Sequence, residues 1–94
     1  MNPDFTNIII NVLQEYDPVS IGVFGSYARN ENHRDSDIDI LVKFKYTPSL
    51  LQLVHVERMI SQKLGIKVDL VTEGAIKNKN IKESIEKDLQ IIYQ

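Results

Sequence analysis

The chain opens with apolar residues at helical spacing and continues with short apolar runs that are typical of strands. Asn2 as a cap and Pro3 at the first helical position predict a helix that begins there. The pair Asp17-Pro18 is expected to end it. The apolar positions of this helix are Phe5, Ile8, Ile9, Val12, Leu13 and Tyr16.

Strand and helix patterns alternate through the rest of the chain. Strands are expected over residues 19–24, 37–44 and 66–71, with one helical turn over 26–30. A second long helix is expected from Thr47-Pro48 to Gly65. Its apolar positions are Leu50, Leu53, Val56, Ile60 and Leu64.

The C-terminal part carries a weaker pattern. Ile81, Ile85 and Leu89 favour a helix to residue 87, followed by a short strand, and residues 77–80 have the composition of a loop. The whole order predicts an α/β fold in which helices flank a small mixed β-sheet.

The size and charge of the chain limit the classes of function that it can have. The 94 residues, 43% hydrophobic and 26% charged, predict a single domain over residues 1–94 with little surface to enclose a bulky acceptor. A net charge of −2 disfavours direct nucleic acid binding. The absence of cysteine excludes disulfides and thiolate zinc sites. With no signal-peptide pattern and no membrane-spanning run, we expect a cytoplasmic protein.

The turn after the first predicted strand has the chemistry of a phosphate site. Gly25 allows a sharp turn and close approach to a triphosphate, while the Ser26 hydroxyl and nearby amides can donate to phosphate oxygens. Arg29 can reach a phosphate, although an ion pair with Glu31 or Asp35 explains it equally well. The neighbouring residues His33 and Arg34 fit a solvated loop better than a contact with the nucleotide.

Asp37 and Asp39 lie two apart in an alternating strand pattern, so both are expected on the face opposite Ile38 and Ile40. Two carboxylates about 5 Å apart repel by roughly 3 kcal/mol at an effective dielectric of about 20, and a hard divalent ion such as Mg2+ relieves this. Asp69, in the third predicted strand, would join them if the two strands are neighbours. The three aspartates could then hold two metal ions.

Other kinds of site that use similar residues are excluded, because the chain lacks the required residues at the required positions. An EF-hand that began at Asp35 would need glycine at residue 40 and glutamate at residue 46, where the chain has Ile40 and Tyr46. No Gly-Lys-Ser/Thr follows Gly25, which excludes a Walker A loop, and the surroundings of Ser26 are not those of a nucleophile elbow.

Gly25-Ser26, Ser36-Asp37-Ile38-Asp39 and the later Asp69 resemble the signature of minimal nucleotidyltransferase (MNT) domains of the DNA polymerase beta superfamily. The resemblance covers essentially the whole chain and implies a polymerase beta-type nucleotidyltransferase fold. Asn30 stands where many relatives have glycine, and asparagine tolerates the same positive φ.

The chain is similar in particular to the MntA-like antitoxins of HEPN/MNT toxin-antitoxin pairs. This resemblance implies transfer of AMP from ATP, with two Mg2+ ions, to a tyrosine of a HEPN ribonuclease toxin, which would be the protein partner. Two alternatives stay open at this point. One is an antitoxin that only binds and occludes its toxin, and the other is a nucleotidyltransferase that modifies a small molecule such as an aminoglycoside.

Overall fold

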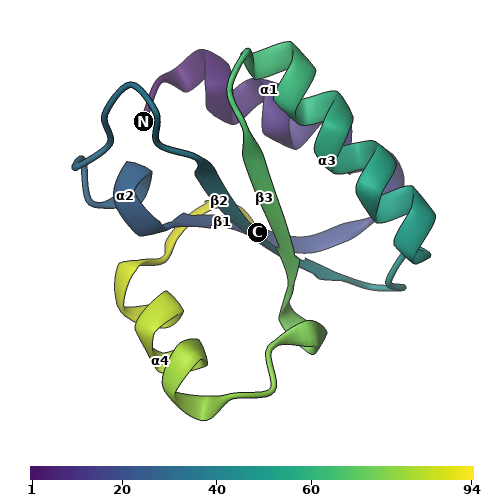
Figure 1. Cartoon of the computed structure of the whole chain (residues 1–94). Coiled ribbons are helices and arrows are strands. Elements are labelled where there is room, and N and C mark those ends of the chain that lie inside the picture. The colour runs from purple at the N-terminus through teal and green to yellow at the C-terminus, as the bar shows by residue number, and fades with distance from the viewer.

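The computed structural model describes all of residues 1–94, and its helices and strands alternate along the chain (Figure 1). The elements are α1 (Pro3–Leu13), η1 (Gln14–Tyr16), β1 (Pro18–Phe24), α2 (Gly25–Ala28), β2 (Ile38–Phe44), α3 (Leu50–Leu64), β3 (Val68–Thr72), η2 (Glu73–Ala75), α4 (Lys79–Asp88) and β4 (Gln90–Tyr93), where η marks a 3-10 helix. The predicted α/β class is confirmed.

The four strands form one mixed sheet in the order β3-β2-β1-β4. Strand β1 is antiparallel to both β2 and β4, whereas β2 and β3 are parallel. Parallel neighbours need a long connection, and α3 supplies it. The pairing of β2 with β3 runs in register from Ile38 opposite Val68 to Val42 opposite Thr72.

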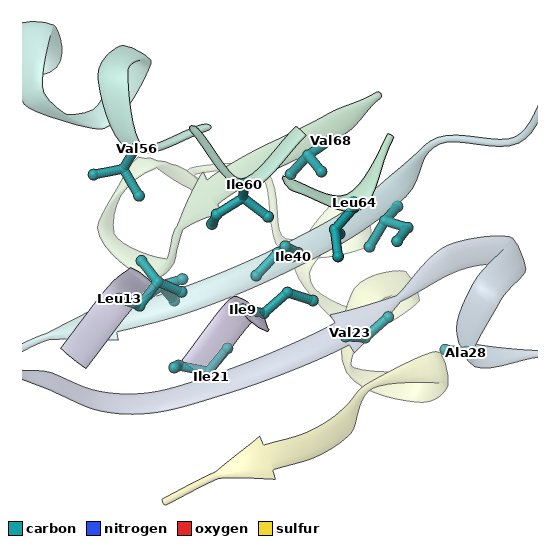
Figure 2. Packing of buried hydrophobic residues seen from close by; sticks show 12 residues of the cluster. Ile9, Leu13, Ile21, Val23, Ala28, Ile40, Val56, Ile60, Leu64 and Val68 are labelled. Carbon is teal, nitrogen blue, oxygen red and sulfur yellow. The ribbon is translucent and has the colours of Figure 1, made fainter. Parts of the chain in front are cut away.

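The core lies between one face of the sheet and the pair α1 and α3, while α4 lies on the other side of the sheet (Figure 1). Alternation along the strands sends the buried side chains of β1 and β2 toward α1 and α3. Figure 2 shows how they pack, and the cluster comprises Ile9, Leu13, Ile21, Val23, Ala28, Ile38, Ile40, Val42, Val56, Ile60, Leu64 and Val68. The opposite face of the sheet is partly covered by α4, in which Ile85 is buried. None of the helices has both the length and the apolar content that a bilayer crossing requires.

The start of α1 confirms the predicted cap. The Asn2 side chain accepts a hydrogen bond from the backbone N–H of Asp4 at 2.8 Å, and Pro3 takes the first helical position. Beyond Leu13 the chain tightens into η1, and Asp17 ends it in the left-handed region with a φ of 52°. The helix predicted to reach Asp17 is thus an α-helix followed by a 3-10 turn.

The predicted start of the second long helix is wrong. Ser49, rather than Thr47, caps α3, since its side chain accepts from the Gln52 N–H at 3.2 Å while the Gln52 side chain accepts from the Ser49 N–H at 3.0 Å. This reciprocal capping box fixes the first turn. Leu50 is 77% exposed and does not join the packed face. Gly65, with a φ of 73°, ends the helix as predicted.

The loop predicted over residues 77–80 is also wrong in part. The Asn78 side chain accepts hydrogen bonds from the N–H groups of Asn80 and Ile81, so Asn78 is the cap of α4 and the helix begins at Lys79. Within α4 only Ile85 is buried, whereas Ile81 is 55% exposed. The expected short terminal strand is confirmed as β4.

Ile60 and Leu50, which both lie in α3, allow a direct test of this packing. Ile60 is fully buried, so Ile60→Ala is expected to lower the free energy of unfolding by about 2–5 kcal/mol, because it removes buried methyl groups and leaves a cavity. Leu50→Ala, on the same helix, should change it by less than about 0.5 kcal/mol. Urea unfolding measures both, and equal losses would contradict the assigned core face.

Candidate active site

The turn at Gly25 lies against the carboxylate of Asp39. Phe24, the last residue of β1, is the register partner of Asp39 in β2, so the next residue comes directly beside it. Gly25 has a φ of +74°, and a Cβ at this position would overlap the Asp39 carboxylate. Both the backbone conformation and the available space therefore require glycine. Ser26 follows in the first turn of α2.

Asp39 and Asp69 face each other across the parallel strands β2 and β3. They are register partners, and both lie on the sheet face away from α1 and α3, because their neighbours Ile38, Ile40 and Val68 are buried in the core. Burial raises the pKa of Asp39 above its ordinary value of 3.8. The negative charges of Asp69 and Asp37 and a hydrogen bond with Asp69 raise it further, and the charge of Arg29 opposes the rise.

Asp37 lies at the edge of this pair. The strand expected to begin at Asp37 begins instead at Ile38. Asp37 therefore lies outside the strand whose alternation was expected to place its side chain on the same face as that of Asp39. Its carboxylate lies 3.7 Å from the Lys67 ammonium. Lys67 also accepts, through its backbone carbonyl, the hydrogen bond from the Ile38 N–H at 3.0 Å. Lys67 was not among the predicted site residues, although its place two residues before Asp69 is a signal for it.

The donors at this site suit a hard divalent cation. Mg2+ takes oxygen ligands, usually one or two carboxylates together with substrate phosphates, and Asp39 and Asp69 offer such oxygens from adjacent strands. The pKa of Asp39 is raised first by burial and then by repulsion from Asp69 and Asp37, and a bound cation would offset both. No group of three or more His, Cys, Asp or Glu side chains stands ready as a metal cluster, and Asp37 is paired with Lys67. The two-ion site of three aspartates stays a prediction.

Arg29 connects α2 to the end of α4. Its guanidinium donates to Asp88 at 2.6 Å and to Glu31 at 3.1 Å, and the hydrogen bonds to Asp88 and then Glu31 raise its pKa. The expected pair with Glu31 is confirmed and Asp35 is not a partner. Asp88 is 59 residues away in sequence, and no local pattern indicates it. A contact between Arg29 and nucleotide stays a prediction.

A second contact between distant segments ties the start of β4 to α2. The side-chain amide of Gln90 donates to the backbone carbonyl of Ala28 at 2.7 Å. Together with the Arg29 and Asp88 pair, it holds the helix that carries Ser26 against the C-terminal segment.

The loop between α2 and β2 is exposed, as predicted for His33 and Arg34. Asn30 adopts a φ of 57°, so the positive φ expected at this position is confirmed. The Ser36 hydroxyl accepts from the His33 N–H at 2.9 Å and closes the loop before Asp37.

Glu57 fixes the strand that carries Asp69. Strand β3 is at the edge of the sheet, so some of its N–H groups have no strand partner. The Glu57 carboxylate, from α3, accepts from the Leu70 N–H at 2.8 Å. This residue holds β3 in place immediately after Asp69, and nothing in the sequence pattern points to it.

These contacts place a glycine turn, a serine hydroxyl and two opposed carboxylates within one small region. A glycine turn with neighbouring N–H and hydroxyl donors can bind phosphate. Two carboxylates can together hold a cation that also binds phosphate oxygens. The arrangement therefore suits transfer of a phosphoryl or nucleotidyl group.

Comparison with known proteins agrees with this chemistry. A family model described as nucleotidyltransferase domain matches residues 7–92. A Methanocaldococcus jannaschii protein named "Putative protein adenylyltransferase MJ0128" is 58% identical over 76 residues, which cover 81% of this chain and 78% of that relative. The protein adenylyltransferase MntA of Thermococcus cleftensis is 50% identical over 58 residues, covering 62% of this chain and 59% of that relative. A crystal structure of a toxin-antitoxin with AMP-PNP superposes with a TM-score of 0.84 at 26% identity, covering 94% of this chain and 72% of that chain.

Proposed function

Because the chain belongs to the nucleotidyltransferase domain family and has its polymerase beta-type fold, we propose that it is a metal-dependent protein adenylyltransferase acting as an antitoxin. It transfers AMP from ATP to a tyrosine hydroxyl of a HEPN ribonuclease toxin. The observation that carries the proposal is the turn at Gly25 packed against Asp39, with Asp69 opposite. The relatives' names support protein as the acceptor class, and the fold shared with a toxin-antitoxin with AMP-PNP supports the toxin and the adenine nucleotide.

Each residue of the site has one role in this proposal. The Gly25 backbone and the Ser26 hydroxyl hold the triphosphate, and Arg29 adds a positive charge close by. Asp37 and Asp39 would hold cations together with nucleotide phosphates, and Asp69 would complete the cation site next to the acceptor hydroxyl. Two Mg2+ ions, when bound, neutralise phosphate charge and stabilise the entering and leaving oxygens.

The reaction exchanges one P–O bond for another. The phenolic oxygen forms a bond to the α-phosphorus, the bond from that phosphorus to the bridging oxygen breaks, pyrophosphate leaves, and the phenolic proton passes to solvent. The chain contributes mainly by holding the two reactants in line, since positioning and electrostatic stabilisation supply most of the catalysis of such transfers. The product carries a bulky anion on the toxin, which repels anionic RNA and occludes its site.

The proposal is tested with the toxin in molar excess. With ATP and Mg2+, the toxin is expected to gain the mass of AMP on a tyrosine and to lose its RNA cleavage activity. Each molecule of added protein should inactivate many toxin molecules, because a catalyst turns over. Intact mass, peptide mapping and an RNA cleavage assay measure this. The matched control replaces ATP by α,β-methylene ATP, in which the bond that must break is blocked.

Two results would contradict the proposal. An unmodified toxin whose inhibition matches the added protein one to one, with either nucleotide, would identify an antitoxin that only binds. AMP transfer to an aminoglycoside without transfer to the toxin would identify a small-molecule enzyme.

A further inference from the structure

A groove of about 540 Å³ opens beside Asp39 and Asp69, between β3 and α4. Its volume lies within the range of sites that bind small molecules or side chains. Seven of its eleven lining residues are hydrophobic, so the groove offers apolar walls next to two carboxylates. None of the roles assigned above uses these walls.

The groove has a polar end and an apolar end. Asp69 and Val71 lie on the same face of β3, about 7 Å apart along the strand. Ile76 follows that strand, and Ile81 and Ile85 form the wall on α4. Ile81 remains 55% exposed although it lines the groove, which leaves an apolar surface without a partner in the chain.

We propose that this groove is the acceptor subsite, which takes the ring of a protein tyrosine and directs its hydroxyl toward Asp69. The inference rests on the proposed function and names the part of the chain that selects the acceptor. Tyrosine has an apolar body and a polar tip, and these match the isoleucine walls and the carboxylate end. Val71, Ile76 and Ile81 are the residues that determine specificity for an aromatic acceptor.

The order of the strands places the Asp69 end of the groove on the entering side of the reaction. The sheet order is β3-β2-β1, so the turn at Gly25, which follows β1, and the edge strand β3 flank Asp39 from opposite sides. In an in-line displacement the entering and leaving oxygens lie on opposite sides of the phosphorus. Pyrophosphate leaving toward Gly25 and Ser26 therefore brings the acceptor oxygen in from β3.

The groove is poorly equipped to bind a purine. Asn78 lines it, but its side-chain oxygen already accepts from the N–H groups of Asn80 and Ile81 as the cap of α4. Lys77 and the side-chain amide of Asn78 are the donors that remain, and the walls formed by Val71, Ile76, Ile81 and Ile85 are hydrocarbon. Apolar walls suit a phenol ring better than a base that has several hydrogen-bonding groups.

Methyl NMR of the protein loaded with Mg2+ and α,β-methylene ATP tests the subsite without any transfer. Addition of N-acetyl-L-tyrosinamide is expected to shift the methyl resonances of Val71, Ile76 and Ile81, whereas N-acetyl-L-serinamide, which has a hydroxyl but no ring, should not. Ile81→Glu is expected to weaken tyrosinamide binding by about tenfold, because a charge replaces an apolar contact. Ile91→Glu is the matched control, since Ile91 is 47% exposed on β4 and does not line the groove.

Two outcomes would overturn the inference. One is the absence of groove shifts with N-acetyl-L-tyrosinamide, and the other is a nucleotide-induced shift of the same methyls with no further response to the probe, which would make the groove a nucleoside site. Ile81→Ala, checked by the dispersion of its spectrum, replaces Ile81→Glu if the charged variant does not fold. If N-acetyl-L-tyrosinamide binds in the groove but the protein transfers no AMP, the proposed function is wrong and the aromatic subsite stands.

Discussion

Asp39→Asn is expected to abolish AMP transfer and, at the same time, to raise the melting temperature of the ligand-free protein. The loss follows because asparagine keeps the shape of the side chain but lacks the charge that holds a cation. Metal coordination supplies several kcal/mol of transition-state stabilisation, so transfer should fall by about 10³-fold or more. The gain in stability follows because the charged Asp39 is half-buried and faces the charges of Asp69 and Asp37.

The pH dependence of stability has a defined sign. The pKa of Asp39 is raised in the folded state, so between its ordinary value of 3.8 and the raised value the folded protein binds more protons than the unfolded chain. The contribution of Asp39 therefore lowers stability as pH rises through this window. Asp39→Asn should remove that part of the pH dependence, and the difference in melting temperature from the wild type should be largest above the raised pKa.

Asp35→Asn is the matched control for this prediction. It makes the same substitution at an exposed position two residues before Asp37. Transfer of labelled AMP and thermal melts at several pH values should leave this variant at wild-type values. Full transfer by Asp39→Asn would contradict the assigned site, and a lower melting temperature than the wild type would contradict the repulsion.

Gly25→Ala is expected to damage both stability and activity. A non-glycine residue at a φ of +74° costs about 1–2 kcal/mol, and the new methyl group would overlap the Asp39 carboxylate. The carboxylate must shift to make room. A misplacement of about 1 Å in a reacting constellation can cost roughly 10²-fold in rate, so kcat/KM for AMP transfer should fall by about that factor.

Gly65→Ala separates the two causes. Gly65 has nearly the same φ, +73°, but a Cβ there would meet no atom within 4 Å. This variant should lose a similar amount of stability from the backbone alone and keep wild-type transfer. If Gly25→Ala and Gly65→Ala had the same activity, the contact between the turn and Asp39 would have no role in the reaction.

Local signals in the sequence predicted most elements, because caps and alternation act over a few residues. Asn2, Pro3 and Gly65 gave correct helix ends, and the apolar runs gave the strands. The errors came where two local signals competed. Thr47-Pro48 resembled a helix start, but the Ser49 and Gln52 capping box, which the same sequence contains, satisfies more N–H groups.

The site was predicted in its residue types but not in its contacts. Gly25 directly follows β1 and Asp39 lies in its antiparallel neighbour β2, so their proximity follows from the register that places Phe24 opposite Asp39. The register of Asp39 with Asp69, the Arg29 pair with Asp88 and the Glu57 contact with β3 join distant segments. Such contacts depend on how whole elements pack, and one sequence carries no local trace of them.

The parallel pairing of β2 with β3 has a consequence for how this fold can change in evolution. The chain between Asp39 and Asp69 includes the loop over residues 45–49, which joins β2 to α3 and supplies none of the site contacts described above. Insertions can accumulate there at little cost to activity. A single residue inserted within β3 before Asp69 would instead turn its carboxylate into the core. The connecting loops should therefore vary in length, whereas the strands should keep a fixed number of residues.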